Sequence, residues 1–184
     1  MQPTQRVAVT VTFLRMERCP PPGPPLPADV SLVRVDRCTV PFYRYLYDTV
    51  GGPYVWWLRR TLPDQTISSI LWDTEVSVHV LYQGGEPAGF FEIDRRGRPT
   101  ANISYFGLLP HAVGRGLGGA FVAAAVQAAW DGPVRAVTVN TCTADHLRAL
   151  PGYHRAGFKT VRRVDEIWEV PARLGMSIPR HLLV

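Results

Sequence analysis

The chain has 184 residues, of which 46% are hydrophobic, and this size suits one compact domain with a substantial core. Its formal net charge of +5 comes almost wholly from arginine, since Lys159 is the only lysine. The arginines are spread along the chain, which favours a basic groove for a small polyanion over a nucleic-acid-binding tail. An arginine-rich genome would explain the same distribution.

The three cysteines, Cys19, Cys38 and Cys142, are too few and too irregularly spaced for a disulfide framework or a metal cage. We therefore expect that the protein works in a reducing cell compartment and that it holds no structural metal. The N-terminal residues lack the apolar core of a signal peptide, and no run approaches the ~20 apolar residues that a membrane helix needs. These features predict a soluble, cytoplasmic protein with no membrane partner.

The first two predicted elements are strands over residues 7–16 and 30–38. They are joined by CPPPGPPLP, residues 19–27, whose prolines exclude a helix or a central strand and predict an extended surface loop. From about residue 41 to residue 74 the apolar pattern is helical, with a break at Gly51-Gly52-Pro53 and a new start near Pro63.

An antiparallel meander follows, with two strands joined around Gly84-Gly85 and a third in ANISYFGLLP, residues 101–110. The remaining predicted elements are a helix after the glycine-rich residues 113–119, a strand at 136–140, a helical piece from about 144 to 157 and a strand at 158–170. Strands on either side of a crossover helix predict a mixed sheet with helices on its faces, of the α/β or α+β class.

The stretch VGRGLGGAFVAAAVQAAW, residues 113–130, places four glycines before a helix that is apolar nearly all round. Glycines let a ligand touch the backbone, and the free amides of a first helical turn attract anions. A P-loop is excluded because Ala120 stands where it needs lysine, and a dinucleotide loop lacks its acidic residue near Val139-Asn140. A phosphate cradle and a ligand-free glycine turn remain open.

The same stretch carries a resemblance to the GNAT superfamily of N-acetyltransferases. In that family a strand and a proline lead into Q/R-x-x-G-x-G/A, and ISYFGLLPHAVGRGLGGA supplies the strand, the proline and Gly116-Leu117-Gly118. Val113 stands at the usual Gln/Arg position, which leaves Arg115 as the charged partner for phosphate. A second signature follows about 30 residues later, where the spacing from His146 through Ala149 to Tyr153, and on to Gly157-Phe158, fits the family pattern.

The resemblance implies one GNAT domain over residues 1–184, with a central mixed, mostly antiparallel sheet of about six to seven strands and flanking helices. It looks like a bacterial branch whose members mostly lack an assigned substrate. It implies an acyltransferase that uses acetyl-CoA as co-substrate and acetylates a primary amine of a small molecule or peptide by direct attack in a ternary complex, without a metal. Homodimers are common in the family.

The resemblance also implies which residues hold the cofactor. By similarity, one group would lie along the pantetheine arm and a second would hold the diphosphate: Phe106, Gly107, Leu108 and Leu109 for the arm, and Val113, Gly114, Arg115, Gly116, Leu117, Gly118 and Gly119 for the diphosphate. Asn140 ends a buried strand where polar groups commonly face the cofactor in this family.

Tyr153 matches the family tyrosine that faces the thioester sulfur, where a phenol would hydrogen-bond the departing thiolate more readily than protonate it. A packed aromatic residue is the alternative. Glu92 lies between Phe91 and Ile93, and a carboxylate among apolar neighbours acquires the raised pKa of a general base, although ordinary strand alternation also explains it.

His146 is a second candidate base, which Asp145 could orient; the alternative, which is favoured, is that Asp145 only caps the helix and His146 only packs. Cys142 has no matched histidine and acid and is not expected to act as a nucleophile. The aromatic residues between 42 and 57 would form either core or a pocket for an apolar or cationic amine, for which Tyr54 and Trp57 are the preferred residues.

Two other functions remain open. One is a catalytically silent acyl-CoA sensor or interaction module with the same fold, expected if Glu92 and Tyr153 lie far from the thioester. The other is nucleic-acid binding by arginines and aromatic residues, which would weaken steeply with salt and ignore acetyl-CoA. The resemblance favours an enzyme without a nucleic-acid partner.

Overall fold

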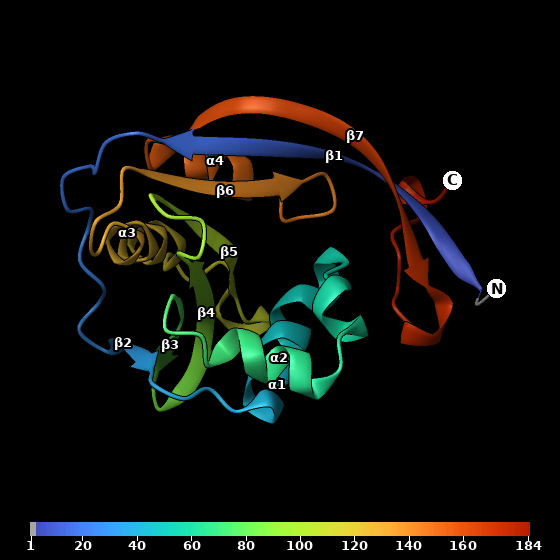
Figure 1. The fold of residues 1–184 in the computed structure, drawn as a ribbon, viewed down its shortest axis with the longest axis horizontal. Helices are drawn as coiled ribbons and strands as arrows, with labels where there is room; N and C mark the ends of the chain where they lie inside the picture. Colours follow the sequence, from blue (N-terminus) through green and yellow to red (C-terminus); the bar gives the residue numbers. More distant parts are fainter. Residues whose placement is uncertain (1–2) are drawn as a thin grey trace.

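A seven-stranded sheet with helices on both faces forms the centre of the molecule (Figure 1), in a computed structural model that describes residues 3–184. The strands are β1 (Thr4–Met16), β2 (Val30–Val35), β3 (Val76–Gln83), β4 (Glu86–Asp94), β5 (Thr100–Leu108), β6 (Ala136–Cys142) and β7 (Lys159–Pro171). The helices are α1 (Val40–Gly51), α2 (Asp64–Leu71), α3 (Gly118–Ala129) and α4 (Ala149–Arg155). Among the described residues, no helix is both long enough and apolar enough to cross a membrane.

The strand order is β2-β3-β4-β5-β6-β1-β7. Neighbouring strands are antiparallel except for β5 and β6, which are parallel. The sheet is thus mixed and mostly antiparallel, and the predicted fold class and meander of β3, β4 and β5 are confirmed.

Strand β1 comes first in the chain but lies between β6 and β7. Val11 pairs with Cys142 of β6 on one side and with Val164 of β7 on the other. The alternating valines of β1, including the buried Val7 and Val9, predict a strand with one apolar face, and they form that face here. They do not predict its neighbours, because alternation sets the face of a strand and not its place in the sheet.

The helices form two layers. Helices α1 and α2 pack against one face of the sheet through Tyr47, Ile67 and Phe90, whereas α3 and α4 cover the other face through Phe121 and Tyr153. No residue from 120 to 130 is exposed, so the prediction that α3 is buried is confirmed. The start of α3 is therefore fixed against the sheet.

Helix α4 differs from its predicted form. The sequence predicts a helical piece from about 144 to 157, but α4 is shorter and runs without a break from Ala149 through Pro151 to Arg155. Pro151 lies in the first turn, where its missing N–H costs nothing, so the turn can begin before it. Tyr153 consequently lies inside the helix and not among its free amides.

The proline-rich loop, residues 19–27, is exposed as expected, but it also packs on α3. The side-chain amide of Gln127 donates a hydrogen bond to the carbonyl oxygen of Pro20 at 3.2 Å. Gly23 passes so close to the helix that a Cβ at this position would lie 2.5 Å from Cβ of Ala123. The loop thus forms an additional wall beside α3, along Ala123 and Gln127.

Candidate active site

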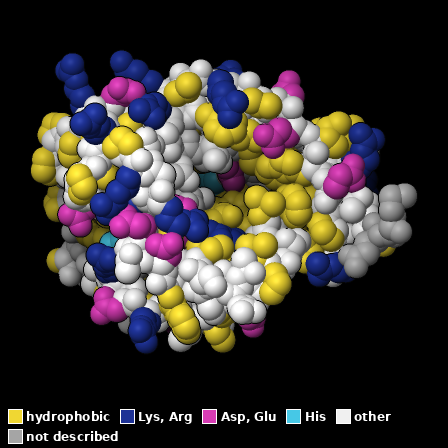
Figure 2. Space-filling model, viewed as in Figure 1, with side chains coloured by type: hydrophobic (Ala, Val, Ile, Leu, Met, Phe, Trp, Pro, Cys, Tyr) yellow, Lys and Arg dark blue, Asp and Glu magenta, His cyan; other side chains and the backbone are white. Residues whose placement is uncertain are grey.

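The site opens where two parallel strands separate. Strands β5 and β6 pair only from Thr100 to Ile103 and from Ala136 to Val139, and each then continues without the other. The separation contributes to a cavity of about 1130 Å³ that both strands line. Figure 2 shows a hollow in the middle of one face of the molecule, bordered largely by hydrophobic side chains.

The glycine-rich loop forms one wall of this cavity. Gly114 and Gly116 have φ values of 84° and 81°, a backbone conformation that residues with a side chain rarely adopt. The first hydrogen bond at the start of α3 runs from the amide of Phe121 to the carbonyl of Leu117. The amides of Gly118, Gly119 and Ala120 precede it and have no partner within the helix.

The space that a side chain would occupy at the glycines of this loop is open. A Cβ at Gly114, Gly116, Gly118 or Gly119 would meet no other atom within 4 Å. Free amides and the positive end of the α3 dipole together attract an anion. The loop therefore fits the diphosphate of coenzyme A, which could approach the backbone without a side chain in the way.

Most of the predicted cofactor residues line the cavity: Phe106, Gly107, Leu108, Val113, Gly114, Gly116, Leu117, Gly118, Gly119 and Asn140. Leu109 does not, because it is buried in the cluster beneath α1. Arg115 is exposed and does not line the cavity either. The cationic side chains of Arg148 and Arg155 do line it, and no spacing in the sequence pointed to them.

Tyr153 also lines the cavity, although only 5% of it is exposed. Its ring lies edge-on between Phe106 and Phe158, with centroids 6.1 and 5.8 Å away. Among the described residues its hydroxyl has no hydrogen-bond partner. Burial, assisted by the charge of Asp145, raises the pKa of Tyr153, so this phenol stays neutral and can donate.

Glu92 lies elsewhere, sealed beneath α1 and not in the lining of the cavity. The hydroxyl of Tyr43 donates to its Oε2 at 2.6 Å, and Nη2 of Arg59 donates to its Oε1 at 2.7 Å. Burial raises the pKa of Glu92, as the sequence predicts, while the charge of Arg59 and the bond from Tyr43 oppose the rise.

Burial lowers the pKa of Arg59, but the Glu92 carboxylate, through its charge and its hydrogen bond, raises it together with Tyr43 and Tyr105, and the net pKa is raised. The raised pKa of Arg59 means that the ion pair keeps the guanidinium protonated. The raised pKa of Glu92 means that the pair does not fully offset the cost of burying the carboxylate. Glu92 as general base stays a prediction, and its complete burial outside the lining of the cavity does not favour it.

An aromatic wall forms another side of the cavity. Tyr54 and Trp57, the two residues expected to bind the acceptor, both line it. So do Tyr47, Trp56 and Tyr105, whose rings contact one another with centroids 4.9 to 5.4 Å apart. The density of aromatic residues signalled this wall, but their spacing could not show which rings face the cavity.

Asp145 is the only acidic residue among the described residues that line the cavity. Its Oδ2 accepts hydrogen bonds from the hydroxyl of Thr141 at 2.7 Å and from the amide of Cys142 at 2.9 Å. Its Oδ1 accepts one from Nε1 of Trp56 at 3.3 Å. These bonds hold the carboxylate against the aromatic wall, and they do not orient His146 or cap α4.

His146 lines the cavity beside Tyr54, and the two ring centroids are 6.2 Å apart. Its Nδ1 accepts a hydrogen bond from the amide of Arg148 at 3.1 Å, but no described side chain caps α4 by a hydrogen bond. Burial, followed by the charge of Asp145, raises the pKa of Cys142 to about 12, and a thiol in that state is a poor nucleophile. No three described His, Cys, Asp or Glu side chains are placed to hold a metal ion.

Comparison with known proteins gives a family match that includes most residues of this cavity. A model of the acetyltransferase (GNAT) family matches residues 43–158, which include both the glycine loop and α4. A search of curated proteins found no match.

Solved structures share the fold at low sequence identity. A conserved protein of unknown function from Staphylococcus epidermidis has a TM-score of 0.61 and 19% identity, over 91% of this chain and 63% of its own. A GCN5-related N-acetyltransferase from Kribbella flavida has a TM-score of 0.60 and 15% identity, over 90% and 60%. The chain thus spans about six tenths of the length of these two proteins.

An aminoglycoside acetyltransferase from an uncultured soil metagenomic sample has a TM-score of 0.56 and 16% identity, over 70% of this chain and 88% of its own. Identities this low show the fold alone. The family match spans well over half of the chain, and its two motifs meet at one cavity. The chain therefore belongs to the GNAT family of acetyltransferases.

Proposed function

We propose that this protein transfers the acetyl group of acetyl-CoA to the primary amine of a cationic acceptor. One observation carries the proposal: free helix amides, an unpartnered tyrosine hydroxyl and a single carboxylate set among aromatic rings all line the same cavity. The first suits a diphosphate, the second a departing thiolate, and the third an ammonium group.

The cofactor would be held mainly by backbone. The amides of Gly118, Gly119 and Ala120 would bind the diphosphate, and the unpaired end of β5 would follow the pantetheine arm along Phe106 and Leu108. Arg148 and Arg155 would add positive charge at the rim of the site.

Asp145 would bind the ammonium form of the acceptor. A carboxylate beside Trp56 and Tyr54 combines a charge-assisted hydrogen bond with cation–π contact, and both favour a cation over a neutral alcohol. Asp145 takes over here the role expected of Glu92, because it is the carboxylate that the cavity exposes.

Transfer would then proceed by direct attack. The ammonium gives its proton to Asp145, directly or through water, and the freed amine nitrogen attacks the thioester carbonyl carbon. The new C–N bond forms, the C–S bond breaks, and the sulfur leaves with the bonding electrons. The nitrogen then loses its second excess proton through water to the thiolate, so the products are a neutral amide and the free thiol. The hydroxyl of Tyr153 donates a hydrogen bond to the thiolate, because its raised pKa makes full proton transfer costly.

Thiol release from acetyl-CoA over a library of amines tests the proposal. Asp145→Asn should raise KM for a cationic amine by roughly 10- to 100-fold, the equivalent of a charge-assisted hydrogen bond, and leave KM for acetyl-CoA nearly unchanged. Glu86→Gln is the matched control, since Glu86 is exposed and does not line the cavity.

Tight binding of acetyl-CoA without turnover on any amine would replace this proposal by the acyl-CoA sensor. Failure to bind acetyl-CoA at all would overturn both functions. Equal effects of Asp145→Asn on amines and on alcohols would remove Asp145 from the acceptor site.

A further inference from the structure

Strand β7 is an open edge of the sheet. It is last in the strand order and pairs only with β1, and Figure 1 shows it at the top of the molecule with no element above it. All residues from Lys159 to Arg163 are exposed. A long edge with unpaired backbone groups readily pairs with another strand unless the sequence prevents it.

The sequence of this edge has a symmetry of charge about Val164. Basic residues precede Val164 and acidic residues follow it at mirrored positions: Lys159, Arg162 and Arg163 on one side, and Asp165, Glu166 and Glu169 on the other. Two exposed apolar residues obey the same symmetry, since Val161 is 62% and Ile167 is 51% exposed.

We propose that two copies of the chain pair their β7 strands antiparallel, with Val164 opposite Val164 of the second copy, and so join two sheets into one. In an antiparallel pair each residue faces the one at the mirrored position. Four of the five facing pairs between residues 159 and 169 are complementary in charge or polarity: Arg163 with Asp165, Arg162 with Glu166, Val161 with Ile167, and Lys159 with Glu169. Thr160 with Trp168 is the exception.

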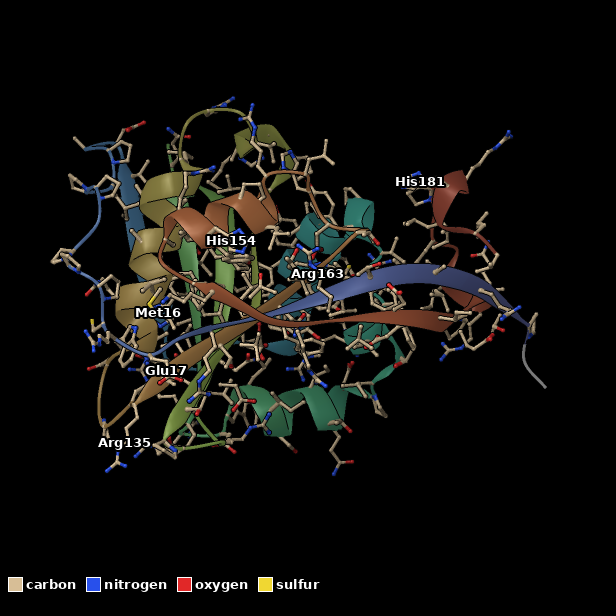
Figure 3. All side chains as sticks on the ribbon, turned by 90° about the horizontal axis from the view of Figure 1, so that it is seen from above. Met16, Glu17, Arg135, His154, Arg163 and His181 are labelled. Atoms are coloured by element: carbon tan, nitrogen blue, oxygen red, sulfur yellow. The ribbon has the colours of Figure 1, made fainter. Side chains whose placement is uncertain are left out.

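The basic half of the edge is available for such pairing. Among the described residues, no ion pair involves Lys159, Arg162 or Arg163. The guanidinium of Arg162 only lies over the ring of Phe13, at 4.2 Å from its centroid. Figure 3, which looks down on this edge, shows Arg163 near the middle of the molecule, where β1 and β7 run together.

The acidic half is held locally but stays exposed. The hydroxyl of Thr10 donates to Oδ1 of Asp165 at 2.6 Å, and the indole of Trp168 donates to Oε2 of Glu166 at 2.8 Å. Asp165 and Glu166 each keep a second oxygen for a cation from the other copy, whereas Glu169 accepts from Thr4 and pairs with Arg6 of its own chain. These bonds set the direction of the carboxylates before the partner arrives.

A bulge at Val161 limits the regular part of the interface. Thr160 pairs with Leu14 and Arg162 with Phe13, so Val161 is an extra residue in β7. Bulges twist an edge and weaken pairing beyond them. The centre of the interface is therefore residues 162–166, with Val161 and Ile167 packing at its margins.

A second copy explains the pattern better than a different partner, because a strand from another protein would need no symmetry about one residue. A two-fold axis at Val164 makes each complementary pair occur twice. The pairing lies outside the acetyl transfer site, to which β7 contributes only Trp168, and it does not depend on the proposed function.

Two charge variants test the pairing. Variant one carries Arg162→Glu and Arg163→Asp, and variant two carries Asp165→Arg and Glu166→Arg. Each variant places like charges opposite each other in its own dimer, so each alone should sediment as a monomer. Mixed in equal amounts, they place opposite charges at every mirrored position and should form a dimer with one copy of each, measured by sedimentation and native mass spectrometry.

The unmodified protein should sediment as a dimer that dissociates as sodium chloride is raised. This measurement on the unmodified protein tests the pairing even if a variant fails to fold. Circular dichroism would show whether each variant is folded. A monomer at every concentration of the unmodified protein, a dimer insensitive to salt, or folded variants that remain dimers alone would each overturn the proposal. So would folded variants that stay monomers when mixed.

Discussion

At the scale of single residues, Tyr43 and Tyr153 are two buried tyrosines whose hydroxyl groups differ in their hydrogen bonding. Both rings are buried, but the hydroxyl of Tyr43 donates to Glu92, whereas that of Tyr153 has no partner among the described residues and lies at the cavity. A buried hydroxyl that contributes nothing to stability is free to serve a ligand. The contrast gives Tyr43 a structural role and supports the catalytic role proposed for Tyr153.

Tyr153→Phe should therefore lower kcat roughly tenfold, the loss of one hydrogen bond to the leaving sulfur, with little change in unfolding free energy. Tyr43→Phe is the matched control and should lower stability by about 1.5–3 kcal/mol, because it removes a bond to a buried carboxylate. Steady-state kinetics and urea unfolding of both variants give the comparison. An unstable Tyr153→Phe with unchanged kcat would mean that Tyr153 is only a packed aromatic.

The Arg59–Glu92 pair predicts a pH dependence. Arg59→Met leaves the Glu92 carboxyl buried without its cation, and its folded pKa, already raised by burial, rises further. A folded pKa above the unfolded one means that the folded state binds more protons, so stability is lost as pH rises from the ordinary carboxyl range toward the folded pKa. The penalty should be small near pH 4 and approach about 3–5 kcal/mol near neutrality.

Arg60→Met is the matched control for this prediction, because Arg60 pairs with Asp48, which is largely exposed. Its effect should stay within about 1 kcal/mol across the same pH range. Urea unfolding at several pH values separates the two. A penalty for Arg59→Met that does not vary with pH would show that lost packing, and not the unpaired carboxyl, is responsible.

Of the residues of the site, sequence reasoning found those that depend on local conformation and missed those that depend on long-range contact. Gly116 and Tyr153 belong to short motifs whose spacing places them at a helix start and on a short helix. Arg59 and Asp145 meet their partners across 33 and 89 residues of sequence. The periodicity of a sequence does not predict contacts between distant segments. The sequence therefore predicted that Glu92 lies in an apolar strand, but not that Arg59 pairs with it.

At the scale of elements, the loop before α3 needs glycines for its backbone conformation. The effect of a glycine substitution on folding can be separated from its effect on cofactor binding. Gly116 and Gly132 both have positive φ, at 81° and 88°, and neither would have a Cβ in contact with another atom. Only Gly116 lines the cavity.

Gly116→Ala and Gly132→Ala should therefore destabilise the fold by similar amounts, about 1–2 kcal/mol each. Only Gly116→Ala should also weaken the binding of acetyl-CoA in calorimetry, because only Gly116 lines the cavity. Equal affinity of the two variants for acetyl-CoA would show that the loop does not hold the cofactor.

The proline-rich loop gives a second prediction at this scale, through its contact with α3. Gly23→Ala would bring two methyl groups into collision at Ala123, so the loop, whose Pro20 and Pro24 line the cavity, should lift from the helix. Affinity for acetyl-CoA should fall several-fold, and the double variant Gly23→Ala with Ala123→Gly should restore it by making room. Calorimetry of the three proteins measures this, and no restoration in the double variant would mean that the loop acts in another way.

At the scale of the whole molecule, the pattern of residues predicted the elements well and their arrangement only in part. Alternating valines and the apolar run of residues 120–130 have the periods of a strand and of a buried helix, and both elements formed. The insertion of β1 between β6 and β7 was not predictable, because many strand orders bury the same apolar faces.

The separation of β5 from β6 depends on the same arrangement. It creates the cavity, and α3 and the proline-rich loop complete its walls. Motif spacing predicted that a cofactor would enter near α3, but the walls became visible only with the sheet assembled. The account thus rests on one physical claim, that the free amides at the start of α3 bind the cofactor diphosphate in this cavity.

Amide hydrogen exchange with and without acetyl-CoA tests this claim most directly. The account predicts that acetyl-CoA slows exchange at Gly116, Gly118, Gly119 and Ala120, whose amides have no partner within α3, and leaves the exposed turn at Gly84 and Gly85 unchanged. Binding of acetyl-CoA that leaves exchange at Gly118, Gly119 and Ala120 unaltered would contradict it.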